Sequence, residues 1–331
     1  MFSKKMKRCI SNKHFLIWST AMVTLTIFLT FSYLQLIKTT DIDIDRIKIN
    51  KKLDRKVAVC ISGYRAENLL HQRLYESHIK FLNENDADLF VYASTTLDQT
   101  EDPVTKSGYN STFNINVFKL LYKNHLQDFK ITKNDKELND ELLFLEKLYK
   151  LPNVTRLYKN VATQFLKIQK CYNDLLKPHE LKRGNNYEWI AYFRPDLLQL
   201  KGIGPINDTW DKDSIYFPGR NSIFDCNWSD AVCKWRAEGN TLGLLDTSFI
   251  ASHSYFHYLA NVIDIYAGNH RYHLHNKFPE SILYYIVKDT FKFKTLPIDM
   301  KYQLDRLPYK TDLNTSFTWL LGKIKENSDS K

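Results

Sequence analysis

This sequence of 331 residues lacks the features of repeat, disordered and nucleic-acid-binding proteins. It has no internal repeat and no low-complexity block, and 14% of its residues are aromatic, which argues against disorder. Its formal net charge is +10, but residues 57–331 contain 35 Lys or Arg and 33 Asp or Glu, so they have almost no basic excess. The remaining 12 basic residues lie in residues 1–56, together with only 4 Asp. A basic face for nucleic acid is therefore not expected in the body of the chain.

Charged residues are also missing from a run of 23 residues, Phe15 to Ile37. At a rise of ~1.5 Å per residue this run is about 35 Å long as a helix, which is enough to cross a bilayer. We expect a transmembrane signal-anchor helix at 15–37. The basic residues of segment 1–14 would keep that segment in the cytosol, so that the rest of the chain is lumenal, a single-pass type II arrangement. The alternative is a cleaved signal peptide, whose apolar region normally has only ~7–15 residues.

Cysteine is scarce, and no Cys-x-x-Cys pair is present, which disfavours a metal site built from cysteines. Of the five cysteines, Cys9 falls on the cytosolic side. In an oxidising compartment the other four permit two disulfides, Cys226–Cys233 across a small loop and Cys60–Cys171, and four buried free thiols are the alternative. Five Asn-x-Ser/Thr sequons follow the apolar run and agree with a lumenal body: Asn110, Asn153, Asn207, Asn227 and Asn314.

The rest of the chain reads as one α/β domain with a mostly parallel central sheet, at 56–310. A charged segment at 38–55 reads as a stem between the membrane and this domain, and 311–331 reads as a polar tail. An anchor followed by a stem favours the Golgi membrane over that of the endoplasmic reticulum.

The domain opens with a strand, a helix and a second strand, the beginning of a parallel α/β sheet. An apolar run at 57–61 predicts a strand buried on both faces, which Ser62-Gly63 ends. An amphipathic helix follows within 67–85, and a second buried strand lies at 87–95. Further helices are expected at 140–150, 157–177, 254–268 and 279–290, and further strands at 189–193, 214–219 and 246–252.

Polar residues directly after the predicted strands are the first candidates for a site, because ligands of open α/β sheets bind at the carboxyl ends of the strands. After the first strand, Gly63 allows close approach of the backbone to a ligand, and Arg65 suits a diphosphate. After the strand at 189–193 come Arg194, Pro195 and Asp196, where a carboxylate can hold a divalent cation. The alternatives are a solvated arginine in the first case and a turn with a local Arg–Asp pair in the second.

Two further carboxylates are candidates. Asp246 stands at the start of the predicted strand at 246–252, before its apolar residues, and reads as a general base or a contact to a sugar hydroxyl, or else as the cap of a turn. Glu280 follows Pro279 at the start of a predicted helix, where a carboxylate is also favoured by the helix dipole. His273 and His275 lie just upstream of this helix and are either ligands for a metal or phosphate or structural residues.

The order of these segments resembles that of Golgi-type glycosyltransferases with the GT-A fold. The segments are VAVCISGYR, ADLFVYAS, WIAYFRPDL, SIYFPG, DTSFIAS and FPES, over about residues 56–290. The sequence is most similar to a loosely characterised group related to bacterial lipopolysaccharide-synthesis transferases. The resemblance implies a Rossmann-like GT-A domain in which the first strand and its turn meet the nucleotide of a sugar donor. It also implies an acidic strand-end motif that binds Mn²⁺ or Mg²⁺ and the diphosphate, and a later Asp or Glu that acts as base or positions the acceptor.

Carried over to this sequence, the resemblance makes Asp196 the metal-binding acid. It makes Gly63, Arg65 and Arg194 contacts to the donor, and Asp246 and Glu280 the catalytic or acceptor-side carboxylates. The family motif usually has two acids, whereas this sequence has one, so the need for a metal ion stays open.

The expected function is thus a membrane-anchored glycosyltransferase, which moves a sugar from a nucleotide sugar to a glycan or glycoconjugate in the secretory pathway. Two alternatives remain. One is an inactive, transferase-like sugar-binding protein, which the single acid allows. The other is a sulfotransferase, which is disfavoured because CISGYRAENLL lacks a phosphosulfate loop rich in Ser, Thr and Gly.

Overall fold

The computed structural model describes residues 55–95, 113–132, 136–149, 156–218, 248–268, 282–283, 285–298, 300–304 and 322. All of them belong to one compact unit of the chain, Asp54–Lys331. The predicted cytosolic tail, membrane span and nearly all of the stem, residues 1–54, lie outside this set. Within the set, no helix has the length and apolar character that a membrane crossing needs.

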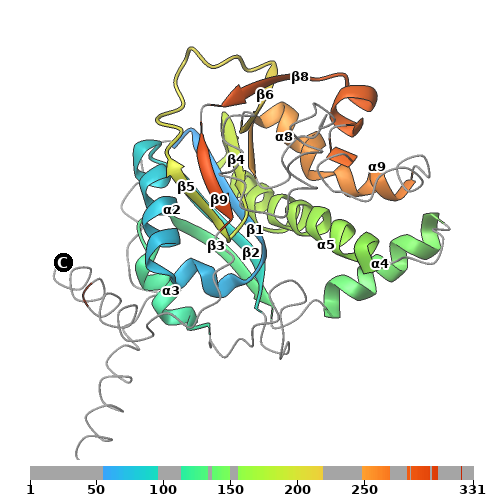
Figure 1. Ribbon diagram of the computed structural model, residues 1–331, viewed down its shortest axis with the longest axis horizontal. Helices are drawn as coiled ribbons and strands as arrows, with labels where there is room; N and C mark the ends of the chain where they lie inside the picture. Colours follow the sequence, from blue (N-terminus) through green and yellow to red (C-terminus); the bar gives the residue numbers. More distant parts are fainter. Residues whose placement is uncertain are drawn as a thin grey trace, which may run out of the picture. The chain divides into compact units, whose positions relative to one another are not determined.

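A seven-stranded mixed sheet forms the centre of the fold, in the order β3-β2-β1-β4-β7-β6-β8. Its strands are β1 (Val57–Tyr64), β2 (Asp88–Ser94), β3 (Leu126–Thr132), β4 (Trp189–Phe193), β6 (Ser214–Pro218), β7 (Ser248–Ser252) and β8 (Lys294–Ile298). Every neighbouring pair is parallel except the two that involve β7, which is antiparallel to both β4 and β6. Six strands therefore point in one direction and β7 in the other (Figure 1). The prediction of an α/β domain with a mostly parallel sheet is confirmed.

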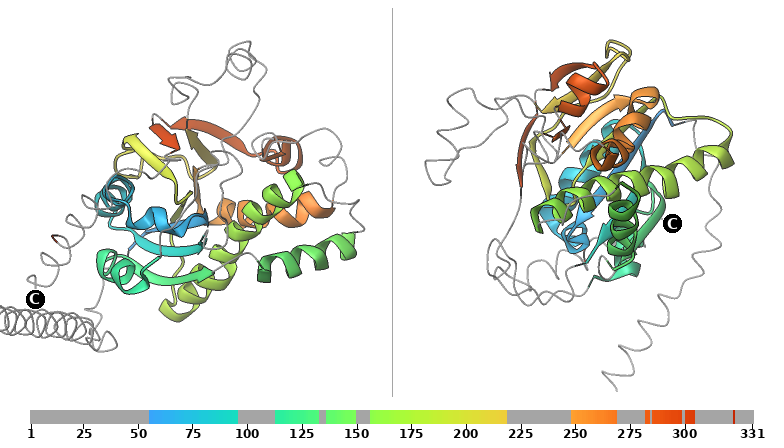
Figure 2. Two further views of the ribbon diagram at one scale, coloured as in Figure 1. Left: turned by 60° about the horizontal axis from the view of Figure 1, so that its bottom comes forward. Right: turned by 90° about the vertical axis from the view of Figure 1, so that its right-hand side faces the viewer.

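Helices cover both faces of this sheet. The mainly apolar strands β1, β2, β4 and β7 are therefore buried on both sides. The helices and short helical turns are η2 (Ala66–Leu70), α2 (Gln72–Glu84), α3 (Ile115–Leu121), α4 (Lys136–Tyr149), α5 (Arg156–Lys170), η3 (Cys171–Leu176), α6 (Lys177–Arg183), α8 (His253–Ala260), α9 (Val262–Gly268) and η5 (Ile286–Thr290). Figure 1 shows α2 and α3 on one side of the strands and α5 on the other. In the right-hand view of Figure 2, α5 lies along the strands as a long helix.

The core is correspondingly divided into two clusters by the sheet. Alternate residues of β1 point to opposite faces, so Val57, Val59 and Ile61 pack on the side of α2 and α3. Ala58 and Cys60 pack on the side of α5, η3 and α8. A separate pair of antiparallel strands, β5 (Leu197–Lys201) and β9 (Lys301–Leu304), lies against α2, where Ser77 Oγ accepts a hydrogen bond from the Gln199 amide at 2.8 Å.

Most predicted elements are present, and the largest differences in their boundaries are the following. The first strand is longer than expected, because Ser62, Gly63 and Tyr64 continue the ladder with β2. The helix expected within 67–85 is broken at His71, whose extended backbone separates η2 from α2. The helix expected at 254–268 is interrupted at Asn261, between α8 and α9.

One of the two proposed disulfides is present. Cys60 of β1 is bonded to Cys171 of η3, with the two Cα atoms 6.2 Å apart. Both residues are fully buried. For this pair the alternative of free thiols is therefore wrong, and the bond fixes the helical segment α5–η3 to the central strand. The other proposed pair, Cys226–Cys233, lies outside the described residues.

Candidate functional site

The chain order of the sheet creates a switch point between β1 and β4. From β1 the chain moves outward to β2 and β3 on one side, and it returns on the other side of β1 at β4. Connections that diverge in this way leave a crevice at the carboxyl ends of the two strands, which is the general ligand site of open α/β sheets. The two motifs selected from the sequence, Gly63–Arg65 and Arg194–Asp196, directly follow or end these two strands. The fold therefore brings them together.

Gly63 and Pro195 are in contact across the switch point. Gly63 has φ 153°, and a Cβ atom placed on it would lie 2.8 Å from Pro195 Cδ. No ordinary Cβ contact is this short, so only glycine fits here. The glycine of the first motif is thus explained by close packing of two strand ends.

Arg65 follows with an unusual backbone. Its φ is 67° and its ψ is 58°, a left-handed conformation that residues with a Cβ rarely adopt. Its carbonyl accepts a hydrogen bond from the Asn68 amide at 3.0 Å, which opens η2. The half-buried Arg65 side chain is therefore held at the strand end by a turn of fixed shape. Backbone strain of this kind is commonly found at binding sites.

Arg194 and Asp196 form a bidentate ion pair. Arg194 Nε donates to Asp196 Oδ1 at 2.9 Å, and a terminal guanidinium nitrogen donates to Oδ2 at 2.8 Å. Asp196 is buried, with 4% of its surface exposed, while Arg194 is half-buried. Pro195 restricts the backbone between them, so both side chains turn to the same side. The local Arg–Asp pair, one of the two alternatives for this motif, is thus present.

This pair does not have the form of a metal site. Both Asp196 oxygens already accept charge-assisted hydrogen bonds from Arg194. In the described parts of the chain, no three His, Cys, Asp or Glu residues are grouped so that they could hold a cation. The described residues therefore do not fit Mn²⁺ or Mg²⁺.

His78 of α2 lies beneath the same motif. It is fully buried, and this burial lowers its pKa to about 4, against the opposing effects of the Leu197 backbone and the negative charge of Asp196. His78 is therefore neutral at pH 7 and adds no positive charge to Arg194.

A further cation lies at the same edge on the α5 side of the sheet, and sequence reasoning missed it. Lys167 of α5 is fully buried, and its Nζ donates to Ser94 Oγ, the last residue of β2, at 2.6 Å. The same Nζ lies 3.3 Å from the centre of the Tyr64 ring. The available signal was spacing, because Lys167 lies one helical turn before Cys171 and so shares its buried face. We call Ser62, Tyr64, Arg65, Ser94, Lys167, Arg194 and Asp196 the strand-end cluster.

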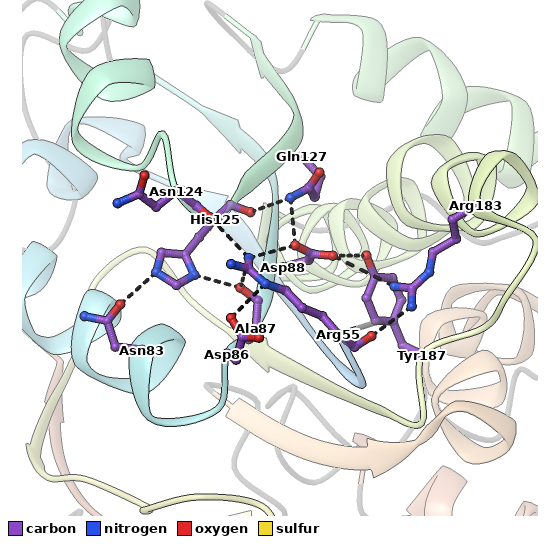
Figure 3. A network of polar contacts seen from close by, with 10 residues as sticks. All are labelled: Arg55, Asn83, Asp86, Ala87, Asp88, Asn124, His125, Gln127, Arg183 and Tyr187. Carbon is purple, nitrogen blue, oxygen red and sulfur yellow. Dashed lines mark hydrogen bonds and ion pairs between the residues drawn. The ribbon is translucent and has the colours of Figure 1, made fainter. Parts of the chain in front are cut away.

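A second polar cluster lies at the opposite, amino-terminal edge of the sheet, around Asp88. The Asp88 carboxylate accepts hydrogen bonds from Arg55 at 2.9 Å, Gln127 at 2.7 Å and the Tyr187 hydroxyl at 2.7 Å. Figure 3 shows these groups closing around it, with Arg183 also nearby. The contact with the Asp88 charge and burial both raise the pKa of Tyr187, burial being the larger effect. Because its acceptors are saturated by protein donors, we interpret this cluster as structural.

Four other candidates cannot be compared with the geometry. Asp246, Glu280, His273 and His275 lie outside the described residues. The structure thus brings together Gly63, Arg65, Arg194 and Asp196 and leaves the two carboxylates assigned to catalysis as predictions.

Comparisons with protein families and with curated sequences do not assign a function to this site. No protein-family model matches the chain, and no curated protein sequence matches it either.

Proposed function

We propose that this chain is a membrane-anchored glycosyltransferase that moves a sugar from a nucleotide-sugar donor to a glycan or glycoconjugate acceptor. One observation carries the proposal: Arg65 and Arg194 follow the two strands that flank the switch point of an α/β sheet, and Gly63 packs on Pro195 there. A crevice in this position with two guanidinium groups suits a diphosphate. The order of the sequence motifs, which resembles GT-A glycosyltransferases, supplies the sugar-transfer chemistry.

The reaction needs stabilisation of a leaving group and removal of a proton. An oxygen of the acceptor hydroxyl bonds to the anomeric carbon of the donor sugar, and the bond from that carbon to the diphosphate oxygen breaks. Arg65 and Arg194 donate hydrogen bonds to the diphosphate as it leaves with the bonding electrons, and a carboxylate takes the hydroxyl proton. Asp246 and Glu280 are our candidates for this carboxylate or for binding the acceptor.

The Arg194–Asp196 pair gives Asp196 a defined role without a metal ion. A bidentate carboxylate holds the guanidinium in one orientation at the strand end before the donor arrives. The guanidinium then donates hydrogen bonds to the diphosphate at the place where the related motif with two acids holds a divalent cation. The alternative of a metal-bound donor is tested by the metal dependence of the reaction.

The disulfide and one sequon support a lumenal location in the Golgi or endoplasmic reticulum. Disulfides persist in oxidising compartments, and Cys60–Cys171 is fully buried in the fold. Asn207, the sequon asparagine among the described residues, is exposed in a turn, as a glycan acceptor must be. A mass loss on endoglycosidase treatment that is smaller by one glycan in Asn207→Gln than in the wild type would place this surface in the lumen.

The test uses the full chain in detergent with a panel of nucleotide sugars. We measure release of the free nucleoside diphosphate, with Mn²⁺, with Mg²⁺ and with a chelator. The key variant is Arg65→Asn, because asparagine tolerates the left-handed backbone and keeps the turn. We expect at least a tenfold loss of donor affinity, whereas Lys294→Met, which removes an exposed cation at the opposite edge, should leave it unchanged.

Three results would contradict parts of this proposal. Binding of no nucleotide sugar would refute the function, and binding without any transfer would favour the inactive sugar-binding protein. Full donor affinity in Arg65→Asn would refute the assignment of the site. Activity that is lost with the chelator and restored by Mn²⁺ would show that a cation is needed after all.

A further inference from the structure

The α5 side of the strand-end cluster contains a second group of polar side chains. Strand alternation places Cys60, Ser62 and Tyr64 on this face of β1. Cys60 is bonded to Cys171, and the Tyr64 ring lies over Lys167, which is one helical turn from Cys171. Ser62 is therefore placed between the disulfide and the Lys167 ammonium group.

Lys167 is held at this position by covalent and polar contacts. The disulfide fixes the register of α5–η3 against β1, and the long side chain then reaches the carboxyl edge of the sheet, where it donates to Ser94 Oγ. A fully buried ammonium group is costly to desolvate, so proteins rarely place one without a polar environment. Lys167 has its polar environment at the carboxyl ends of β1 and β2, beside the switch point, where its ammonium group contacts the Ser94 hydroxyl.

The Ser62 hydroxyl gives independent support for a ligand at this place. Ser62 is fully buried, and its Oγ has no hydrogen-bond partner among the described residues. A buried hydroxyl without a partner destabilises the protein that contains it, whereas a ligand oxygen at this place would satisfy it.

We infer that Lys167, Ser62 and Ser94 form the inner wall of an oxyanion subsite beneath Tyr64, which takes a phosphate group of a nucleoside diphosphate. An ammonium and two hydroxyls are donors, and a phosphate oxygen accepts from all three. This inference rests on the proposed function, because it gives the donor diphosphate a second contact beside Arg65 and Arg194.

Tyr64 is the cover of this subsite. Tyr64 is 37% exposed, and one face of its ring lies against the Lys167 ammonium. A phosphate reaches Lys167 only when the ring turns aside, and the ion pair with phosphate then replaces the cation–π contact. Tyr64→Ala should therefore keep or increase the affinity for a small anion, while loss of affinity in this variant would refute the role of a cover.

The experiment measures binding of inorganic pyrophosphate to the full chain in detergent by calorimetry. Lys167→Met, which keeps the length of the side chain, should weaken binding by at least tenfold. The control is Lys170→Met on the same helix, which removes an ion pair with Glu141 and should change binding by less than twofold. Wild-type affinity in Lys167→Met would overturn the inference.

Ser62→Ala separates a ligand role from a structural one even if Lys167→Met does not fold. Because the hydroxyl has no partner among the described residues, its removal should leave the thermal midpoint unchanged or raise it, while pyrophosphate affinity falls at least threefold. A lower midpoint with unchanged affinity would mean that Ser62 is structural, and the inference would fail.

The probe also separates this inference from the proposed function. Pyrophosphate carries no sugar and no base, so its binding does not depend on transfer activity. Lys167-dependent binding without release of nucleoside diphosphate from any nucleotide sugar would leave the subsite standing and refute the transferase. Release that is unaffected by Lys167→Met, together with unchanged pyrophosphate binding, would refute the subsite alone.

Discussion

The Cys60–Cys171 disulfide should provide a large part of the stability of the folded domain. The two cysteines are separated by 111 residues, so the bond closes a long loop in the unfolded chain. The loop-closure relation gives an entropy loss of about 16 cal/mol/K for such a loop, or about 5 kcal/mol at 25 °C. We therefore expect the double variant Cys60→Ala, Cys171→Ala to lose about 4–5 kcal/mol of unfolding free energy.

Urea unfolding of the full chain in detergent, followed by tryptophan fluorescence, measures this loss. Trp189 is buried on β4, the strand beside β1, and so reports on the region that the disulfide holds. The control is Cys9→Ala, which changes a cysteine of the predicted cytosolic tail and should leave the midpoint unchanged.

A loss below about 1 kcal/mol in the double variant would refute the loop-closure reasoning for this protein. Counting the free thiols of the denatured wild-type chain would then show why the loss is small. If the pair is oxidised and the loss is still small, the unfolded chain already keeps these segments together, and the entropy term is overestimated. If the pair is reduced, the bond does not form in the protein as prepared.

Three other changes have defined outcomes. Asp88→Asn removes the charge that Arg55 binds, and should cost about 3 kcal/mol of unfolding free energy, measured by urea titration. His78 has its pKa lowered to about 4 in the folded protein, so the unfolded chain binds the extra proton first. Stability should be complete above pH ~6.5 and fall by about 3 kcal/mol as the pH decreases to 4, and His78→Leu should remove this part of the pH dependence. Gly63→Ala forces a Cβ against Pro195 and should cost about 1–3 kcal/mol, whereas Gly202→Ala, whose Cβ would meet only ordinary contacts, should cost less than ~1 kcal/mol in the same urea titration.

Each of these has an outcome that would contradict it. Asp88→Asn with wild-type stability would mean that the cluster in Figure 3 contributes little beyond its geometry. An unchanged pH profile in His78→Leu would show that another group titrates over that range. Equal costs for the two glycine variants would mean that the contact with Pro195 relaxes without strain.

The strands that were predictable from the sequence are those buried on both faces. Runs such as 57–61 and 189–193 are continuously apolar, a pattern typical of strands that helices cover on both sides. β3 and β8 were missed because they lie at the edges of the sheet, where LQDFKIT and KTLPI mix exposed and buried positions. β5 and β9 were also missed, and they form their own small sheet.

The position of the candidate site was predictable, but its internal contacts were not. Strand ends mark the binding edge of an α/β sheet, and Arg65 and Arg194 do follow the two strands that flank the switch point. Whether Asp196 binds Arg194 or a cation depends on the geometry of the side chains, and a three-residue motif does not predict that geometry. Lys167 was missed because a lysine in an amphipathic helix is ordinarily solvent-exposed, and its burial follows from the disulfide one turn away.

The direction of β7 in the sheet also could not be predicted from the pattern of apolar residues. An apolar run of five residues predicts a strand equally well in either direction. Its antiparallel placement puts Ser248 opposite Phe193, so the beginning of β7 lies at the same edge as the end of β4. The choice between directions is made by the connections before and after the strand.

The position of β1 determines how the domain responds to mechanical load. If the domain is anchored through segment 1–54, as we propose, tension enters it at Arg55, whose guanidinium pairs with Asp86 and Asp88 at the start of the neighbouring strand. The load then runs along β1, which is paired with β2 on one side and β4 on the other. Pulling in this direction shears two ladders of hydrogen bonds together instead of opening one bond at a time. A domain tethered in this way should resist force at its attachment point better than one tethered through an edge strand.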